Sequence, residues 1–291
     1  MAFTIPASLR ALLPARWRRR KPRVAVVRLS GAIGAASPFR PGLSIAGLAG
    51  PLEQAFATPH IAAVALVINS PGGSPAQSHL IHQRIRALAA EKKLPVYAFV
   101  EDVAASGGYM IACAADEIVA DPTSLIGSIG VVSAGFGFDR LIERLGVDRR
   151  VHTQGEAKAM LDPFRPENPD DIVRLKQIQA DVQDLFTTLV RGRRPTLDPN
   201  GENLFTGAVW TGRQALRLGL VDGLGDARST LRARFGDEVQ LVMVAEKRGS
   251  LVARLLRRAN PGSTAGLAGA GLAGEALAVI EERAAWARFG L

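Results

Sequence analysis

Residues 61–68 are the feature that most constrains how this chain can fold. Their sequence, Ile-Ala-Ala-Val-Ala-Leu-Val-Ile, is apolar throughout and lacks the alternation of a strand that has one face in water. Such a run predicts a strand covered on both faces, as in a parallel sheet. It ends at Asn69-Ser70-Pro71-Gly72-Gly73, which has the composition of a turn.

A helix is predicted directly after this turn. Ser74 suits the capping position, Pro75 suits the first helical position, and Gln77 has the spacing that completes a capping box. Apolar residues spaced by three or four give the helix a buried side, made of Ile81, Ile85 and Leu88.

The strand-and-helix pattern repeats along the chain. Further strands are predicted at residues 24–29, 94–100, 117–120 and 239–244, and helices at 167–190 and 214–218. Residues 101–105 are expected to form a loop, and residues 122–130 a turn region. Because strands alternate with helices, we expect an α/β fold of parallel crossover units. One large domain, residues 24–249, would carry terminal extensions at 1–23 and 250–291.

The positive charge of the 291-residue chain is concentrated in its N-terminal arm. The formal net charge is +9, and residues 1–23 contribute +7 of it without any acidic residue. The rest holds 29 basic and 27 acidic side chains, so the body is nearly neutral. Basic arms bind phosphate-rich surfaces, either nucleic acid or anionic lipid. This arm also holds apolar residues typical of interfacial segments, namely Phe3, Ile5, Leu9, Leu12, Leu13 and Trp17.

Three interpretations of the arm follow. A solvated arm is the simplest, contact with an anionic membrane surface comes second, and no nucleic acid is expected as a partner. The early apolar run is too short to span a bilayer and precedes the charges, which is the reverse of the order in a secretory signal. We therefore expect a cytoplasmic protein, with peripheral contact at the inner face of the cell membrane as a further option. The tail after residue 249 is expected to be a basic amphipathic surface helix with an Ala/Gly/Leu-rich end.

Ser106 is the candidate nucleophile, because it stands at a strand-to-helix turn with Gly107 and Gly108 behind it. Backbone N–H groups at such turns are unsatisfied donors, so this loop and the one at Gly72 and Gly73 suit an oxyanion. The simpler explanation is that the glycines serve tight turns. The single cysteine, Cys113, forms neither an internal disulfide nor a zinc site by itself.

A serine nucleophile needs a base, and the residues leave its identity open. The four histidines are His60, His79, His82 and His152, and none has a context that singles it out, with His79 and His82 expected to lie off the apolar stripe of their helix. Lys158 stands among small and apolar residues, but a lysine base must have its pKa lowered from about 10.4 to about 7 or 8 by burial. An exposed loop lysine is the plainer description of Lys158.

Four motifs in order resemble the signal peptide peptidase A family, which is serine peptidase family 49 of the Clp/crotonase-like superfamily. They are Asn69-Ser70-Pro71-Gly72-Gly73, Ala105-Ser106-Gly107-Gly108-Tyr109, Gly127-Ser128-Ile129-Gly130-Val131, and Lys158 five residues before Pro163. The resemblance covers about residues 24–245, including a segment from Phe205 to Asp222. It implies a crotonase-like α/β fold of stacked ββα units.

The resemblance also implies roles for individual residues. Ser106 would be the nucleophile, Lys158 its general base, and Ser128 the residue that orients the lysine. The amides of Gly73 and Gly107 would form the oxyanion hole. A ring-shaped homo-oligomer is implied, in which the lysine reaches the serine of a neighbouring subunit.

The predicted activity is therefore hydrolysis of peptide bonds in apolar peptides, such as cleaved signal peptides or membrane-protein fragments, without a metal or organic cofactor. Family members commonly begin with a membrane-spanning anchor, whereas this chain begins with the basic arm. Two alternatives stay open. One is a crotonase-type acyl-CoA enzyme that uses Glu101 and Asp102, and the other is a non-catalytic scaffold at the membrane surface.

Overall fold

A mixed sheet with helices on both faces forms the body of the protein. The computed structural model describes residues 21–34, 42–197, 204–244 and 286–290. The strands are β1 (Arg23–Ser30), β2 (Ile61–Ser70), β3 (Val96–Ala105), β4 (Glu117–Ala120), β5 (Leu125–Gly127), β6 (Val209–Thr211), β7 (Gly223–Leu224) and β8 (Gln240–Met243). The helices are α3 (Ile45–Phe56), α4 (Pro75–Lys92), α5 (Gly107–Ala112), α6 (Asp139–Arg144), α7 (Pro169–Arg193), α8 (Gly212–Arg217) and α9 (Ala227–Phe235), with a 3-10 turn η1 (Glu156–Ala159).

The strands follow the order β6-β5-β3-β2-β1-β8, and β4 and β7 form a branch next to β3. Their pairings are parallel except for that of β5 with β6. The predicted α/β fold of parallel crossover units is thereby confirmed. Parallel strands end at the same edge of a sheet, so the loops after β2, β3 and β5 meet there.

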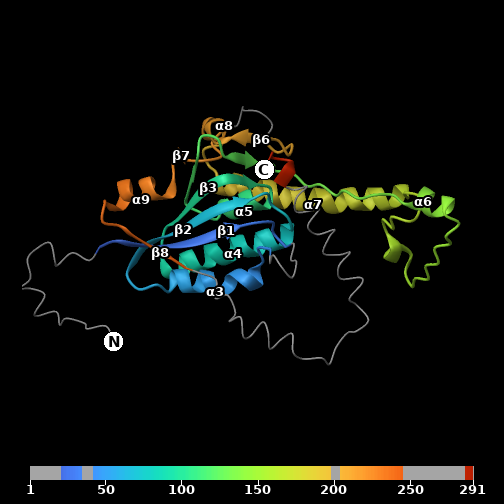
Figure 1. The fold of residues 1–291 in the computed structure, drawn as a ribbon, viewed down its shortest axis with the longest axis horizontal. Coiled ribbons are helices and arrows are strands. Elements are labelled where there is room, and N and C mark those ends of the chain that lie inside the picture. The colour runs from blue at the N-terminus through green and yellow to red at the C-terminus, as the bar shows by residue number, and fades with distance from the viewer. Residues whose placement is uncertain (1–20, 35–41, 198–203, 245–285, 291) are drawn as a thin grey trace, which may run out of the picture.

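The central strand β2 is buried on both faces, as its sequence predicts. Val64, Leu66 and Ile68 join the main core with α3, α4 and α5, whereas Ala63 and Ala65 pack on the opposite face, which α9 covers. Figure 1 shows α3 and α4 on one side of the strands and α9 at the far end from α6. The predicted buried side of α4, Ile81, Ile85 and Leu88, lies in the main core.

Two predictions about the sheet are wrong. Residues 101–105, expected as a loop, continue β3, and residues 125–127 of the expected turn region form β5. The cause is a change of partner along β3, because Tyr97 to Val100 pair with β4 and Val103 to Ala105 pair with β5. The second pairing supplies the hydrogen bonds that keep the strand extended.

The predicted cap of α4 is half correct. The Ser74 side chain accepts a hydrogen bond from the Gln77 amide, as expected. The Gln77 side chain does not return to Ser74 and instead accepts from the Ile45 amide at the start of α3, at 2.9 Å. This residue therefore joins two helices and does not complete a capping box.

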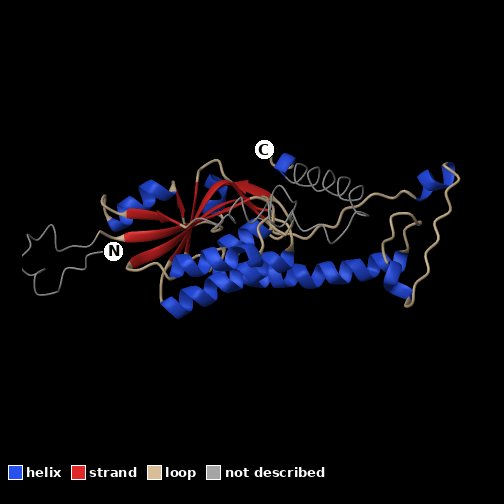
Figure 2. Cartoon of the chain, turned by 60° about the horizontal axis from the view of Figure 1, so that its bottom comes forward, coloured by secondary structure: helices blue, strands red, loops and turns tan. Residues whose placement is uncertain are grey.

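Helix α7 begins and ends close to the predicted bounds, but little of it is buried. Only Phe186 and Val190, near its end, are buried in the protein, and Ile178 and Leu185 are exposed. The reason is visible in Figure 2, where the long helix extends well beyond the sheet. The segment that includes α6 and η1, residues 139–161, lies at that outer end (Figure 1).

The predicted arm and tail lie outside the described residues, except for 21–23 and 286–290. Lys21 forms an ion pair with Glu238 at 3.3 Å, and the Gln240 amide donates to the carbonyl of Pro22. The arm therefore joins the body beside α9 and β8. Among the described residues, no helix has the length and apolar character needed to cross a bilayer.

Candidate active site

Ser106 occupies a sharp turn between β3 and α5. Its backbone has φ 51° and ψ −121°, a combination that is unfavourable for a residue with a side chain. The turn is held by hydrogen bonds from the Ser106 amide to Gly127 at 2.7 Å and from Met110 to the Ser106 carbonyl at 3.0 Å. Such strain costs about 1–3 kcal/mol and persists mainly at functional sites. The turn resembles in its geometry the nucleophile turn of other hydrolases.

Sheet register places Ser128 next to Ser106. Ala105 of β3 is paired with Gly127 of β5, so each serine is the residue that follows a paired position. Ser128 also has a φ of 51° and is buried, and its amide donates to the carbonyl of Ala208 at 2.7 Å. The two predicted site serines are thus brought together by strand pairing.

The loop after β2 packs directly against the Ser106 turn. Ser70 is paired with Ala104, which sets the ends of β2 and β3 side by side. A Cβ atom on Gly72 would lie 2.8 Å from the Ser106 Cβ, and one on Gly108 would lie 2.6 Å from the Ser70 carbonyl. Only glycine permits this approach of the two loops.

The amides of Gly73 and Gly107 both lie outside the hydrogen-bond pattern of the elements to which they belong. Gly73 forms an isolated parallel bridge with Ile33, in which Ile33 bonds to the Gly72 carbonyl and the Ser74 amide. The N–H of Gly73 therefore points away from Ile33, since in a parallel bridge the central residue directs its own groups to the other side. Gly107 is the first residue of α5, where an amide has no partner inside the helix.

Ser106 and Ser128 line a common cavity of about 470 Å³. Its other lining residues are Gly130, Val131, Val132, Lys176, Gln179, Ala180, Gln183, Phe205, Thr206, Gly207 and Arg288. They come from the segment after β5, from α7, from the segment before β6 and from the C-terminal residues. Gln183 fixes one wall by donating to the Phe205 carbonyl at 3.0 Å.

Lys158 is not brought to this cavity within one chain. It belongs to η1 in the outer part of the molecule, is exposed, and is absent from the described residues that line the cavity. Lys176 does line the cavity, and the sequence analysis missed it. The sequence pattern that indicates Lys176 is helical spacing. Residues spaced by three and four positions share one face of a helix, and here that face of α7 carries Lys176, Gln179, Ala180 and Gln183.

Other candidate groups are unsuited to act at Ser106. Burial raises the pKa of the Cys113 thiol to about 12, so this side chain is an inert core residue. Desolvation lowers the pKa of His82 to about 4, and its Nδ1 lies 3.0 Å from the carbonyl oxygen of Met110. His82 is thus buried against α5, which corrects its expected place off the apolar stripe. None of the four histidines lines the cavity.

The carboxylates considered for acyl-CoA chemistry are also engaged elsewhere. Glu101 pairs with Arg28, and Asp102 accepts a hydrogen bond from Asn69. Neither carboxylate lines the Ser106 cavity.

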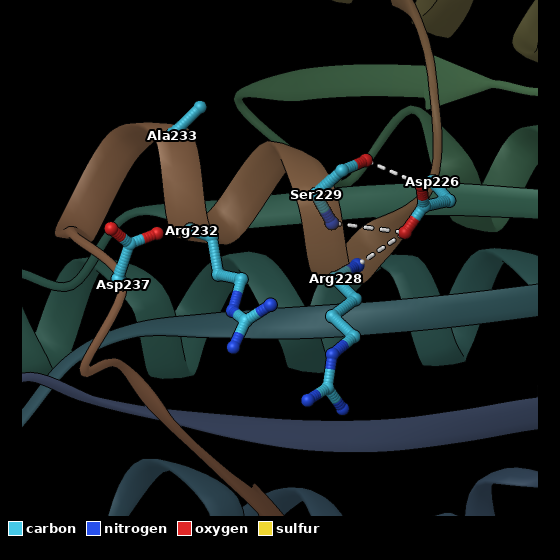
Figure 3. Close-up of a pocket in the computed structure, with 6 residues that line it drawn as sticks. All are labelled: Asp226, Arg228, Ser229, Arg232, Ala233 and Asp237. Carbon is cyan, nitrogen blue, oxygen red and sulfur yellow. Dashed lines mark hydrogen bonds between the residues drawn. The ribbon is translucent and has the colours of Figure 1, made fainter.

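A second hollow lies over α9, away from the serines (Figure 3). Its Asp226 is used as the helix cap, accepting from the amides of Arg228 and Ser229 and from the Ser229 hydroxyl. Arg228 and Arg232 extend from the same side of the helix. Asp226 and Ser229 are thus engaged in capping the helix, so the cavity at Ser106 remains the candidate active site.

Comparisons with known proteins support a peptidase. The sequence pattern of peptidase family S49 matches residues 88–240. The chain is 50% identical over 298 residues to a Brucella abortus (strain 2308) protein named Na(+)/H(+) antiporter NhaA, which covers 100% of this chain and 40% of that protein. It is 37% identical over 159 residues to the chloroplastic serine protease SPPA of Arabidopsis thaliana, which covers 54% of this chain and 23% of that protein.

The chain thus spans less than half the length of both curated relatives. A solved structure of a mutant of the 1510-N membrane-bound stomatin-specific protease has a TM-score of 0.49 at 17% identity, covering 78% of this chain and 99% of that one. The family match includes Ser106 and Ser128 and the strands that bring them together. This chain belongs to peptidase family S49, the family of signal peptide peptidase A.

Proposed function

We propose that this chain is a serine endopeptidase that hydrolyses peptide bonds with a Ser106–Lys158 dyad. The observation that carries the proposal is the position of Ser106, strained at the end of β3, beside Ser128 and in contact with the Gly72 loop. Membership of a peptidase family supports the same chemistry.

The reaction would proceed through an acyl-enzyme. Neutral Lys158 takes the proton of Ser106, and the serine oxygen attacks the scissile carbonyl carbon. The Gly73 and Gly107 amides hydrogen-bond to the tetrahedral oxyanion, each contributing on the order of 3 kcal/mol. Lys158 then protonates the leaving amine, and a water molecule activated by the same base releases the acyl group. Ser128 orients the lysine.

We propose further that Lys158 is supplied by a neighbouring copy in a homo-oligomer. Within one chain it is exposed at the outer end of the molecule, in a part that carries uncovered apolar side chains. These include Phe136, Leu141, Leu145, Val147 and Val173, which are 51–81% exposed. Apolar surface of this kind marks protein interfaces, and burial against a second copy would also favour the neutral form of the lysine.

The proposed substrates are extended apolar peptides, such as cleaved signal peptides or fragments of membrane proteins. Val131, Val132 and Phe205 give the Ser106 cavity an apolar side that suits them. No cofactor takes part in the proposed reaction.

Substitution of the two dyad residues tests the proposal. Ser106→Ala and Lys158→Ala should each abolish cleavage of casein or a fluorogenic peptide, and the control Arg174→Ala, at an exposed residue that does not line the cavity, should not. The rate should rise with pH, because the proposed base acts in its neutral form. Full activity of either dyad variant, or a rate that does not change between about pH 6 and 10, contradicts the mechanism.

Labelling of Ser106 by a fluorophosphonate would exclude the alternative that the protein is a non-catalytic scaffold.

The acyl-CoA alternative has no support at the site, because Glu101 and Asp102 are engaged away from the cavity. Binding of coenzyme A measured by calorimetry would revive it.

We also propose that the N-terminal arm contacts anionic lipid, with the protein at the cytoplasmic face of the membrane. The arm carries +7, and it joins the body where Lys21 meets Glu238, next to α9. The exposed Arg228 and Arg232 on α9 have no acidic partner among the described residues. Their charge lies close to the point where the arm joins the body.

A further inference from the structure

One face of α7 forms a wall of the Ser106 cavity and carries a positive charge. Lys176, Gln179, Ala180 and Gln183 all line the cavity, which means that this helix face is turned toward the site over about two turns. Gln183 anchors the inner end of the wall to Phe205. Lys176 stands at the outer end, about 10 Å along the helix axis from Gln183 at 1.5 Å per residue.

The charged side chains that line the cavity are all positive. Lys176 and Arg288 are its charged residues, and no Asp or Glu lies among the described lining residues. Within the described part of the chain, Lys176 is exposed and takes part in no ion pair or side-chain hydrogen bond. A cation in the same cavity as a nucleophile, without a carboxylate in the lining to neutralise it, attracts a negative group from outside the protein.

We propose that Lys176 is a specificity-determining residue that binds a carboxylate of the peptide substrate. This inference rests on the proposed peptidase function and adds a chemical requirement to it. The carboxylate is either the free C-terminus of the peptide or an acidic side chain near the scissile bond. An extended peptide advances about 3.3 Å per residue, so the 10 Å from Gln183 to Lys176 corresponds to about three residues.

The Ser106 cavity combines an apolar side with a positively charged end, which explains how a need for a substrate carboxylate would select among peptides. Val131, Val132 and Phe205 favour apolar side chains, whereas Lys176 favours a negative group at the outer end. An apolar segment released by an earlier cut has both features, since that cut leaves a new C-terminal carboxylate. The same segment inside an intact protein lacks the terminal charge, so Lys176 would favour released peptides over intact chains.

The test compares matched peptides as substrates of the full 291-residue chain. One pair differs only in a free or amidated C-terminus, and a second pair, with amidated ends, differs only in Glu or Gln near the cleavage site. The wild-type enzyme should cleave the charged member of at least one pair with kcat/KM about three- to tenfold higher, and added salt should reduce the preference. The pair that responds identifies the source of the carboxylate.

Variants of Lys176 assign the effect to this side chain. Lys176→Met should bring the preference close to one, Lys176→Glu should reverse it, and Lys176→Arg should retain it. The matched control is Arg174→Met, which removes the same charge from α7 at an exposed residue that does not line the cavity. A preference that survives in Lys176→Met, or that is lost equally in Arg174→Met, overturns the inference. Equal loss of activity on all peptides in Lys176→Met would also overturn it.

Binding separates this inference from the proposed reaction. Fluorescence anisotropy with labelled peptides on Ser106→Ala measures recognition without cleavage. Tighter binding of the charged peptide that disappears in Ser106→Ala/Lys176→Met supports the inference even if the wild-type enzyme cleaves none of the peptides, an outcome that contradicts only the proposed function. Equal binding of charged and neutral peptides by Ser106→Ala contradicts the inference itself.

Discussion

Ser106 and Ser128 are the residues that follow the paired positions Ala105 and Gly127, and both have a left-handed backbone with a φ of 51°. Neighbouring strands therefore deliver two strained serines to one cavity. The hydrogen bond from the Ser106 amide to Gly127, at 2.7 Å, ties the first turn to the strand that carries the second. Because strain of this kind is held by the surrounding structure, it can be measured through stability.

Glycine at position 106 should stabilise the protein relative to alanine. Both substitutions remove the hydroxyl, but only glycine adopts the Ser106 backbone without strain, so Ser106→Gly should exceed Ser106→Ala by about 1 kcal/mol in free energy of unfolding. Urea denaturation measures the difference. At Ser78, inside α4, the order should reverse, since glycine in a helix costs about 0.5–1 kcal/mol relative to alanine. Equal stability of the two Ser106 variants would show that the turn is unstrained.

A methyl group at position 72 should damage the active site specifically. In Gly72→Ala the new Cβ would lie 2.8 Å from the Ser106 Cβ, in addition to the strain of a φ of 101°. Gly31→Ala is the matched control, because Gly31 has a φ of 113° and open space around its Cβ position. Both variants should lose about 1–3 kcal/mol of stability, but only Gly72→Ala should lose most of its peptidase activity. Similar activities in the two variants would rule out a close packing of the Gly72 loop on Ser106.

Inactive variants should complement each other if neighbouring copies share the site. When Ser106→Ala and Lys158→Ala subunits are unfolded together and refolded at equal amounts, about one quarter of the sites combine an intact serine with an intact neighbouring lysine. Activity should therefore return to about a quarter of the wild-type value. A mixture as inactive as its components would place both residues of each site in one chain.

Burial of His82 should make the protein less stable in weak acid. Desolvation lowers its pKa from 6.5 to about 4, so the unfolded chain binds the proton more readily than the folded one. The contribution of His82 is full above pH 6.5, falls as the pH drops toward 4, and amounts to on the order of 3 kcal/mol. Urea denaturation between pH 4 and 7 should show a weaker pH dependence for His82→Gln.

His79→Gln is the control for this effect, because His79 lies one turn earlier in α4 and contacts Gln83 on the outer side. It should keep the pH dependence of the wild-type protein. A wild-type slope in His82→Gln would mean that His82 does not govern the acid response.

The N-terminal arm should govern binding to anionic vesicles. In a flotation experiment with vesicles that contain an anionic phospholipid, the full chain should float and a chain that begins at Val24 should not. High salt should release the full chain, because the attraction is electrostatic. Arg228→Gln/Arg232→Gln should reduce flotation partially, and equal flotation of both chain lengths would refute the role of the arm.

The sequence by itself determined the parallel sheet, the long helix and the four motifs of the site. The continuous apolar run at 61–68 requires cover on both faces, and glycines at strand ends mark where loops approach each other. These are local properties, and the structure bears them out in β2 and in the Gly72 and Ser106 loops.

Only the tertiary structure decided which residues become neighbours. The strand β3 continues through residues 101–105 because β5 pairs with it, and Gln77 bonds to Ile45 because α3 lies within reach. Likewise, Lys176 lines the Ser106 cavity, whereas Lys158, with its recognisable motif, is exposed in the outer part of the molecule. Contacts between residues far apart in sequence depend on how elements pack, and no local pattern specifies that packing.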